Sequence, residues 1–240
     1  MNMNRMINFA WCVGMVVALA SLPEAQSAQN ARSAKPAPAP ARSAAPQTSG
    51  IARNPYIGAI VVDAATGKVL FEDQADTRAY PASVLKLMDL LIILEKIERR
   101  QLSYQDTVTV SANASRIGGS QVWLAEKETF TVEELLYALM VQSANDSAMA
   151  LAEKVAGSSA AFVQLMNQRA KELGMNNTRF NSVHGLPPGQ GQEPDVTTAR
   201  DFTLLCRELL KHPDTLRFTS TRERPFRPNV PAKMVMMRTH

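Results

Sequence analysis

The chain has 240 residues, 45% of them hydrophobic, and a formal net charge of +4. This length and composition are typical of one good-sized domain, or two small ones, with a real hydrophobic core, and they exclude a disordered protein. Four basic residues and one acidic residue in residues 1–50 give +3, which leaves +1 for residues 51–240. A nearly neutral domain argues against nucleic-acid binding. The one local exception is a cluster of arginines: Arg222, Arg224 and Arg227.

The first 27 residues have the order of a secretory signal peptide. Arg5 gives a positive start, and an apolar stretch from Phe9 to Leu22 is too short and too early for a permanent membrane anchor. Small residues follow at Ala25-Gln26-Ser27 and at Ala18-Leu19-Ala20, and either group offers a cleavage site. We therefore predict a signal peptide over residues 1–27 and export to the periplasm or cell envelope. An uncleaved membrane anchor is the alternative.

Residues 28–53 consist mainly of Ala, Pro and Ser, with hardly an apolar anchor. Such a segment buries too little surface to offset its chain entropy, so we predict a disordered linker. The folded domain is predicted to span residues 54–240. After signal cleavage Cys206 is its single cysteine, which rules out an intrachain disulfide and favours a buried, small apolar side chain.

From residue 54 onward the sequence predicts one β-hairpin followed by helices. Residues 57–62 and 68–71 are β-branched and apolar, with a short turn ending in Gly67 between them. Thr131 and Glu134 form a capping-box pattern. A short strand is predicted at 107–111, and helices are predicted at 80–100, 129–143, 144–157, 159–175 and 197–213. This pattern indicates an α+β fold with a helical lobe beside an antiparallel sheet.

Ser83 and Lys86 are three residues apart near the start of an almost wholly apolar helix. Residues at this spacing share one helix face, so the hydroxyl and the amine are neighbours. Burial lowers the pKa of a lysine, and a neutral lysine can activate a serine. We therefore predict Ser83 as a nucleophile and Lys86 as its general base. The alternative is structural, because the pattern also arises by chance and a lysine in an apolar helix often extends its ammonium to water.

Ser143 and Asn145 form a second group at the junction of two predicted helices. Ser143 is placed to pass a proton to or from a leaving group, and Asn145 to hold a substrate carbonyl or to orient Lys86. The structural alternative is helix capping, because Ser, Asn and Asp are ordinary residues at a helix start and Ser143 with Asp146 resembles a capping box.

The order of these two groups matches the S-x-x-K and S-D-N motifs of penicillin-binding proteins and class A β-lactamases, with Ala144 in place of Asp. Over residues 54–240 the sequence resembles the serine D-alanyl-D-alanine carboxypeptidases, the low-molecular-mass penicillin-binding proteins. The stretches that carry the likeness are "YPASVLKLM", "GGSQVWLAEKETFTVEELLYALMVQSANDSAMALAE", "FVQLMNQRAKELGMNNTRFNSVHGLP" and "TTARDF". The resemblance implies a β-lactamase/transpeptidase-like fold.

The resemblance also implies a hydrolase that cleaves the terminal D-Ala from peptidoglycan stem peptides through an acyl-enzyme on Ser83. Lys86 would take the serine proton, Ser143 would relay a proton to the departing D-Ala, and Asn145 would position the peptide. The backbone N–H of Ser83 would be one half of an oxyanion hole. β-Lactam antibiotics would acylate Ser83 as substrate mimics.

The third motif of the family, Lys-Thr-Gly, is absent from the 240 residues. The resemblance places it on a strand beside the nucleophile, where it binds the terminal carboxylate of the substrate. We therefore expect an incomplete domain whose C-terminal strands, and any peripheral membrane anchor, are not encoded in this chain. The hairpin is then expected to have an unpaired edge, and the chain to be poorly stable and weakly active.

The sequence leaves other functions open: a D,D-endopeptidase, a class A β-lactamase or an inactive truncated fragment. Glu193-Pro194-Asp195 faintly resembles the glutamate-proline loop of the β-lactamases, but the Asn that would complete that loop is missing. No cofactor is implied. No metal is predicted either, because His212 and His240 lack metal-ligand spacing. His184 is predicted to be structural in its loop.

Overall fold

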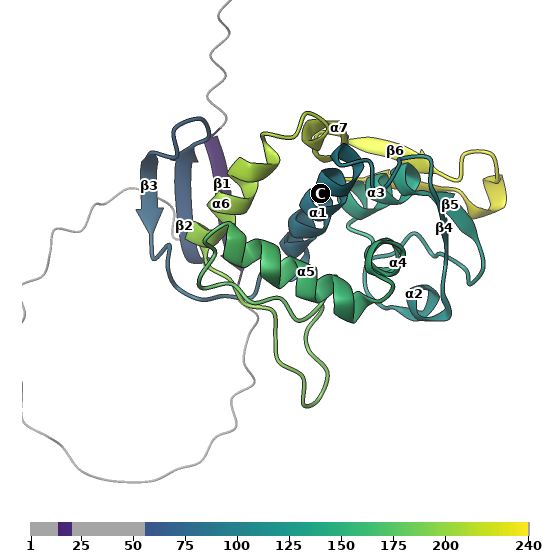
Figure 1. The fold of residues 1–240 in the computed structure, drawn as a ribbon, viewed down its shortest axis with the longest axis horizontal. Helices are drawn as coiled ribbons and strands as arrows, with labels where there is room; N and C mark the ends of the chain where they lie inside the picture. The colour runs from purple at the N-terminus through teal and green to yellow at the C-terminus, as the bar shows by residue number, and fades with distance from the viewer. Residues whose placement is uncertain (1–13, 21–55, 240) are drawn as a thin grey trace, which may run out of the picture.

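The computed structural model describes residues 14–20 and 56–239. The predicted linker, and the predicted signal peptide apart from residues 14–20, lie outside the described residues. An antiparallel sheet lies at one end of the molecule, beside a lobe of helices that carries two smaller strand pairs (Figure 1). This arrangement confirms the predicted α+β class. In the part of the chain that the structure describes, no helix is long and apolar enough to cross a membrane.

The main sheet has three strands in the order β1-β2-β3. They are β1 (Gly14–Ala20), β2 (Tyr56–Asp63) and β3 (Val69–Asp73). β2 and β3 form the predicted hairpin. β1 lies within the predicted apolar stretch of the signal peptide and pairs with β2, with Gly14 opposite Asp63 and Ala18 opposite Ala59. β2 is therefore the central strand, and the hairpin keeps one unpaired edge among the described residues, along β3.

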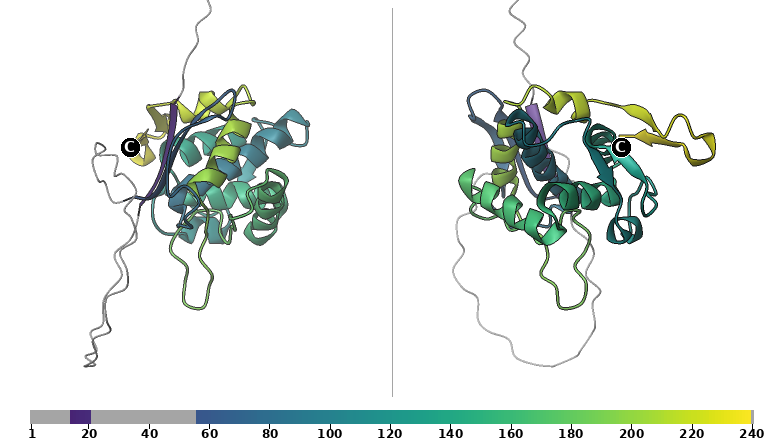
Figure 2. Two further views of the ribbon diagram at one scale, coloured as in Figure 1. Left: turned by 90° about the vertical axis from the view of Figure 1, so that its left-hand side faces the viewer. Right: turned by 45° about the vertical axis from the view of Figure 1, so that its right-hand side comes forward.

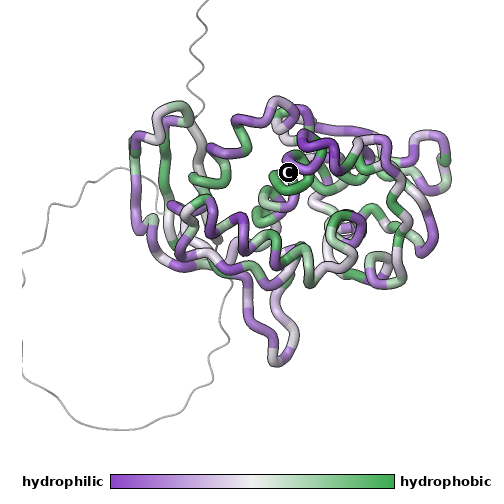
Figure 3. Tube along the Cα trace, in the orientation of Figure 1, coloured by the Kyte–Doolittle hydropathy of each residue, from purple (hydrophilic) through white to green (hydrophobic). Residues whose placement is uncertain are grey.

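The helical lobe is built around one buried helix that runs through its middle (Figure 1). Its α-helices are α1 (Lys86–Glu98), α2 (Ala112–Arg116), α3 (Val132–Val141), α4 (Asn145–Ala156), α5 (Ser159–Glu172), α6 (Ala199–Leu209) and α7 (Thr215–Thr219). Three apolar side chains of α1 have no exposed surface: Leu90, Leu91 and Ile93. They belong to one hydrophobic core with residues of α3, α4, α5 and α6. Figure 3 shows the hydrophobic trace gathered along these helices. The predicted capping box of Thr131 and Glu134 is confirmed at the start of α3.

Helix α6 joins the sheet to the helical lobe, because it contacts β2 on one side and α1 on the other. Ala199 at its start shares a small second core with Ile60 of β2. On its polar side Arg200 pairs with acidic residues on and after β3. Arg207 donates hydrogen bonds to carbonyl oxygens of the hairpin turn. These contacts fix the sheet against the element that also supports α1. Buried Cys206 lies on the same helix, as predicted.

Two further strand pairs flank the lobe, and of their four strands the sequence pattern predicts β4 alone. They are β4 (Thr107–Thr109) with β5 (Thr129–Thr131), and β6 (Glu223–Phe226) with β7 (Val235–Arg238), the latter joined through a 3₁₀ turn (Pro231–Lys233). The β6–β7 hairpin projects from the lobe (Figure 2). Arg224 lies over the ring of Tyr137 at 3.8 Å, and Arg227 pairs with Glu128 at 2.7 Å. Arg224 and Arg227, two of the three clustered arginines, therefore hold the β6–β7 hairpin against the lobe.

Candidate active site

The predicted nucleophile stands at a sharp turn into α1. The single helix predicted over 80–100 is instead a 3₁₀ turn (Ala82–Leu85) followed by α1, which ends at Glu98. Ala82 has a positive φ of 47°, outside the α-helical range, so the helix cannot extend back to residue 80. Side chains three residues apart are eclipsed in a 3₁₀ turn. This geometry brings the Ser83 hydroxyl to the Lys86 amine.

The two predicted catalytic side chains differ in their access to solvent. Ser83 is exposed, whereas Lys86 is only 1% exposed. Leu85 and Met88, its neighbours in sequence and on the helix, have no exposed surface. A substrate can therefore reach the hydroxyl, while the amine beneath it is shielded from water. The alternative interpretation, in which Lys86 extends its ammonium to solvent, is wrong.

Lys86 Nζ lies within hydrogen-bond distance of four oxygen atoms. They are Ser83 Oγ at 3.0 Å, Ser143 Oγ at 3.2 Å, Asn145 Oδ1 at 2.8 Å and the main-chain oxygen of His184 at 3.1 Å. The four side chains singled out from the sequence thus meet at one point, although they come from the turn before α1, α1 itself and the start of α4. The His184 carbonyl is a further partner that no sequence motif indicates.

These four contacts determine how a neutral amine at Lys86 would use its hydrogens. The oxygens of Asn145 and His184 are carbonyl acceptors that cannot donate. A neutral amine has two N–H bonds, and these two acceptors occupy both. The single nitrogen lone pair is then left to accept from one hydroxyl at a time, that of Ser83 or that of Ser143. The site therefore orients the amine as a base toward two hydroxyl groups.

Burial also favours the neutral amine. Desolvation lowers the pKa of Lys86 from 10.5 to about 8, while the negative charges of Asp89 and Asp146 act in the opposite direction. With a pKa near 8, roughly a tenth of the amines are neutral at pH 7. Lys86 can therefore accept a proton near neutral pH, as a general base must.

The capping interpretation of Ser143 is wrong. The N-cap residue of α4 is Ala144, and no side chain caps this helix. Ser143 instead has a positive φ of 56°, a strained conformation for a residue with a Cβ. Its hydroxyl oxygen lies 3.2 Å from Lys86 Nζ, within hydrogen-bond distance. Backbone strain of this kind persists where surrounding contacts hold a side chain in one position. Here it keeps the Ser143 hydroxyl next to the Lys86 amine.

Asn145 connects the amine to the loop on its other side. Its Oδ1 accepts from Lys86, and its Nδ2 donates to the main-chain oxygen of Gly118 at 2.8 Å. Gly119 has a positive φ of 79°, and a Cβ there would lie 2.6 Å from Asn145 Nδ2. The backbone N–H of Asn145 donates to the carbonyl of Ser120. Asn145 thus contacts Lys86, the geometry expected if it orients the amine, and its second amide hydrogen has no partner among the described residues.

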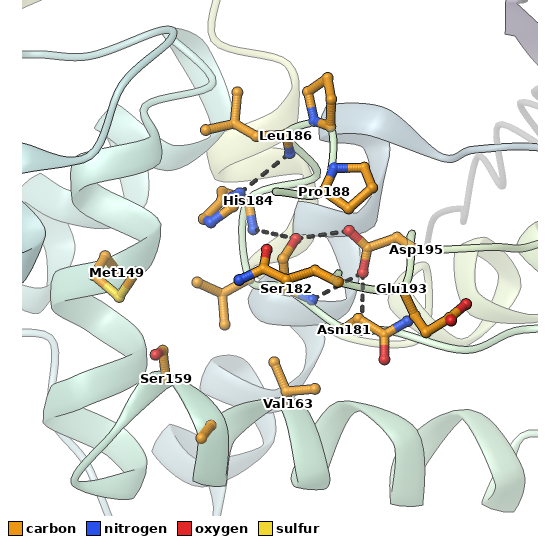
Figure 4. Close-up of a pocket in the computed structure, with 14 residues that line it drawn as sticks. Met149, Ser159, Val163, Asn181, Ser182, His184, Leu186, Pro188, Glu193 and Asp195 are labelled. Carbon is orange, nitrogen blue, oxygen red and sulfur yellow. Dashed lines mark hydrogen bonds between the residues drawn. The ribbon is translucent and has the colours of Figure 1, made fainter. Parts of the chain in front are cut away.

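A loop at residues 181–195 closes the opposite side of the site. Asp195 anchors the two ends of this loop to each other, because its carboxylate accepts from the backbone N–H groups of Asn181 and Ser182 and from the Ser182 hydroxyl (Figure 4). The three distances lie between 2.6 and 2.9 Å. The buried carboxylate therefore fixes the base of a loop that projects from the body of the molecule (Figure 2).

Within that loop Gly185 packs against the turn before α1. It has a positive φ of 75°, and a Cβ there would collide with the carbonyl oxygen of Ala82. This close approach brings the main-chain oxygen of His184 to Lys86. The His184 ring accepts a hydrogen bond through Nδ1 from the backbone N–H of Leu186. The side chain is thus structural in its loop, as predicted, while the backbone belongs to the site.

Two cavities flank the loop. One of about 520 Å³ lies between the loop and helices α4 and α5, with Met149 and Val163 on its wall (Figure 4). The other, of about 310 Å³, is lined by Ala82, Tyr80 and several prolines. Of the two, the smaller one adjoins the turn that carries Ser83, so it is the better placed to receive part of a substrate. Glu193 lines the larger cavity and does not contact Ser83 or Lys86 through a hydrogen bond.

A separate cluster of possible metal ligands lies where α1, α5 and α6 meet. Ligand atoms of Glu95, Glu208 and His212 lie within 4.8 Å of one another. The guanidinium of Arg169 contacts Glu95 at 2.7 Å and Glu208 at 3.0 Å. The Arg169 side chain already supplies the positive charge between the two carboxylates, so the cluster is a set of ion pairs that joins the three helices.

Comparison with known proteins identifies the family. A family model described as D-alanyl-D-alanine carboxypeptidase, peptidase S11, matches residues 51–239, which is most of the chain. The chain belongs to the peptidase S11 family. The resemblance inferred from the motifs is therefore confirmed, and with it the penicillin-binding-protein fold of the helical lobe and sheet.

Relatives of this peptidase S11 chain carry related names. It is 36% identical over 182 residues to the D-alanyl-D-alanine carboxypeptidase DacF of Bacillus subtilis, covering 76% of this chain and 46% of the relative. It is 34% identical over 165 residues to the D-alanyl-D-alanine endopeptidase of Escherichia coli, covering 69% and 51%. The chain thus spans about half the length of these relatives.

Solved structures show the same likeness. Penicillin-binding protein 6B of Escherichia coli has a TM-score of 0.71 at 27% identity, covering 81% of this chain and 60% of that protein. Penicillin-binding protein D2 of Listeria monocytogenes, in its ampicillin-bound form, has a TM-score of 0.65 at 29% identity, covering 76% and 71%.

Proposed function

We propose that this chain carries the acylating site of a serine-type D-alanyl-D-alanine carboxypeptidase, which removes the terminal D-Ala from peptidoglycan stem peptides. The observation that carries the proposal is the position of Lys86: a buried amine with two carbonyl acceptors and two hydroxyls around it, one of them on exposed Ser83. Membership of the peptidase S11 family and the names of its relatives support the substrate class.

In the proposed reaction Ser83 Oγ attacks the carbonyl carbon of the terminal D-Ala-D-Ala bond while its proton passes to the Lys86 lone pair. The backbone N–H of Ser83 is one donor to the oxyanion that forms. As the C–N bond breaks, the proton passes from Lys86 through Ser143 to the amine of the departing D-Ala. Water, deprotonated by the same amine, then attacks the ester carbonyl. As the bond to Ser83 Oγ breaks, the proton returns from Lys86 to that oxygen and the shortened peptide leaves. The remaining amide hydrogen of Asn145 holds the peptide.

The experiment is release of D-Ala from an N-acylated peptide ending in D-Ala-D-Ala, measured for the chain and for Ser83→Ala. The proposal predicts release that is lost in Ser83→Ala and reduced by about two to four orders of magnitude in Lys86→Met. Release that persists in Ser83→Ala contradicts the proposal, because another group would then be the nucleophile. No release from the unaltered chain would contradict it as well, and would favour an envelope-binding fragment without catalysis.

A D,D-endopeptidase is the second candidate, favoured by the likeness to the endopeptidase of Escherichia coli. The same assay with a cross-linked dimer of stem peptides separates the two, since an endopeptidase cleaves the internal bond faster. Turnover of a chromogenic cephalosporin tests the β-lactamase alternative, because a carboxypeptidase acylates and then releases the product slowly. Each of these substrates is found in the cell envelope, so we propose that the protein is exported there.

A further inference from the structure

Trp123 is the most exposed large hydrophobic side chain among the described residues, and its backbone is strained. The side chain is 64% exposed, and the residue has a positive φ of 54°. A bulky residue rarely adopts a positive φ, because its Cβ crowds the backbone. Glycine or asparagine would occupy this position at a lower cost. An exposed ring gains little packing in return, so the hydrophobic core does not explain why a tryptophan stands here.

Contacts on both sides of Trp123 hold its backbone in this conformation. The backbone N–H groups of Val122 and Leu124 donate to the carboxylate of Asp146, which has no exposed surface. From another direction the guanidinium of Arg227 donates to the main-chain oxygens of Val122 and Trp123, at 2.8 and 3.0 Å. Val122 and Leu124 are both buried. A fixed backbone therefore presents the indole ring between them to solvent.

The segment that carries Trp123 also forms one wall of the active site. The main-chain oxygen of Gly118 accepts from the side-chain amide of Asn145, and that of Ser120 accepts from the Asn145 backbone N–H. The Ser120 hydroxyl donates to the main-chain oxygen of Gln142 at 2.7 Å. Trp123 follows Ser120 by three residues, which span at most about 11 Å of extended chain. The ring thus lies on the surface close to the groups that would bind a substrate peptide.

We propose that Trp123 is a stacking surface for a sugar ring of the peptidoglycan glycan strand. The inference rests on the proposed function, because the stem peptide of that substrate is joined to the glycan at its other end. The flat face of an indole packs against the C–H groups of a sugar ring, while the sugar hydroxyls keep polar partners. Exposed Glu126 and Lys127, in the same loop, offer such partners. The ring would bind the glycan beside the cleavage site and take no part in the reaction.

The test uses the intrinsic fluorescence of Trp123. The chain has two tryptophans, so Trp11→Phe leaves Trp123 as the single indole. Ser83→Ala in the same chain prevents turnover during the titration. One probe is a disaccharide of N-acetylglucosamine and N-acetylmuramic acid that carries a stem peptide ending in D-Ala-D-Ala, and the other is the same peptide without sugar. We expect the indole emission to shift with the first probe and to stay unchanged with the second.

Variants at position 123 test the same assignment by calorimetry. Trp123→Ala should weaken binding of the sugar-bearing probe about tenfold. Trp123→Gly suits the positive φ, so it should weaken binding equally even if alanine disturbs the loop. Trp123→Phe keeps a ring and should retain most of the affinity. Leu70→Ala is the matched control, because it removes a side chain of similar exposure, 60%, from β3, and it should leave the affinity unchanged.

Two binding results would overturn the proposal. The first is an equal affinity, or no affinity, of the sugar-bearing probe for the parent chain, Trp123→Ala and Trp123→Gly. The second is an equal loss for the sugar-free peptide, which would place Trp123 in the peptide site. An emission shift on vesicles of phosphatidylglycerol, with none on the sugar-bearing probe, would assign the ring to a membrane surface and also overturn it.

The D-Ala release assay decides the proposed function separately. If the chain releases no D-Ala but binds the sugar-bearing probe through Trp123, the enzyme assignment fails and the glycan site stands. If release proceeds and loss of the indole changes nothing in binding, the glycan site fails and the enzyme assignment stands.

Discussion

At the scale of single residues, the site depends on the difference between an exposed hydroxyl and a buried amine. Ser83 and Lys86 are sequence neighbours with opposite solvent access because the 3₁₀ turn places one above the other at the entrance to α1. Two carbonyl oxygens then occupy the N–H bonds of the neutral amine. Contacts from the turn before α1, from the start of α4 and from the 181–195 loop therefore determine which way the lone pair of Lys86 Nζ points.

The pKa of Lys86 predicts the pH profile of acylation. Lys86 acts as a base in its neutral form, and its pKa is lowered to about 8. The second-order rate of acylation by a β-lactam should therefore rise with pH and level off above about 8, since this rate reports the free enzyme. Stopped-flow or mass-spectrometric rates between pH 5 and pH 10, on the order of ten points, measure it. A rate that is flat through this window would contradict the assignment of Lys86 as the base.

The close approach of the 181–195 loop to the turn that carries Ser83 requires a glycine at position 185. A Cβ at this position would collide with the Ala82 carbonyl, whereas a Cβ at Gly191 meets nothing within 4 Å, although both residues have positive φ. Gly185→Ala should therefore lower the acylation rate about tenfold or more by displacing the turn of Ser83. Gly191→Ala carries the same backbone strain of about 1 kcal/mol without the collision, and should keep the rate. Equal rates in the two variants would show that the loop does not position Ser83.

At the scale of elements, three helices depend on Arg169. Its guanidinium on α5 contacts Glu95 on α1 and Glu208 on α6, and all three side chains are mostly buried. A planar guanidinium can hold two carboxylates at once, which a lysine cannot do with the same geometry. This junction supports α1 at the end opposite to Lys86.

We expect Arg169→Met to lower the free energy of unfolding by about 1–3 kcal/mol, because two partly buried carboxylates lose a charged partner. Lys211→Met is the matched control. It removes another cation from Glu208, but from an ion pair whose lysine is 70% exposed, so the loss should stay below about 0.5 kcal/mol. Urea denaturation followed by circular dichroism measures both. Similar losses in the two variants would argue against a structural junction at Arg169.

The sequence predicted the long elements of this fold and missed the short ones, for physical reasons. Helices α3 to α6 have strong apolar periodicity with caps or glycine ends, and Lys86 was marked by its apolar surroundings. Strands β6 and β7 have four residues each, and they are held by distant contacts such as Arg227 with Glu128. The His184 carbonyl escaped prediction because a backbone atom carries no residue signature.

At the scale of the whole molecule, residues 14–20 have two competing roles. They lie within the predicted signal peptide, and in the structure they form β1 along β2. We predict that the exported protein is cleaved after Ala20 or after Ser27 and so loses β1. Intact-mass measurement of protein recovered from the cell envelope tests this. A mature protein that keeps Gly14–Ala20 would contradict the signal-peptide prediction and make β1 a permanent strand of the sheet.

The measurement that tests the account most directly is peptide mapping by mass spectrometry after incubation with a β-lactam, performed on the chain and on Lys86→Met. We predict one covalent adduct, on Ser83, in the unaltered chain, and little or none in Lys86→Met at the same pH. An adduct on another residue, or equal labelling of Ser83 without the amine of Lys86, would contradict the claim that a buried neutral lysine activates this serine.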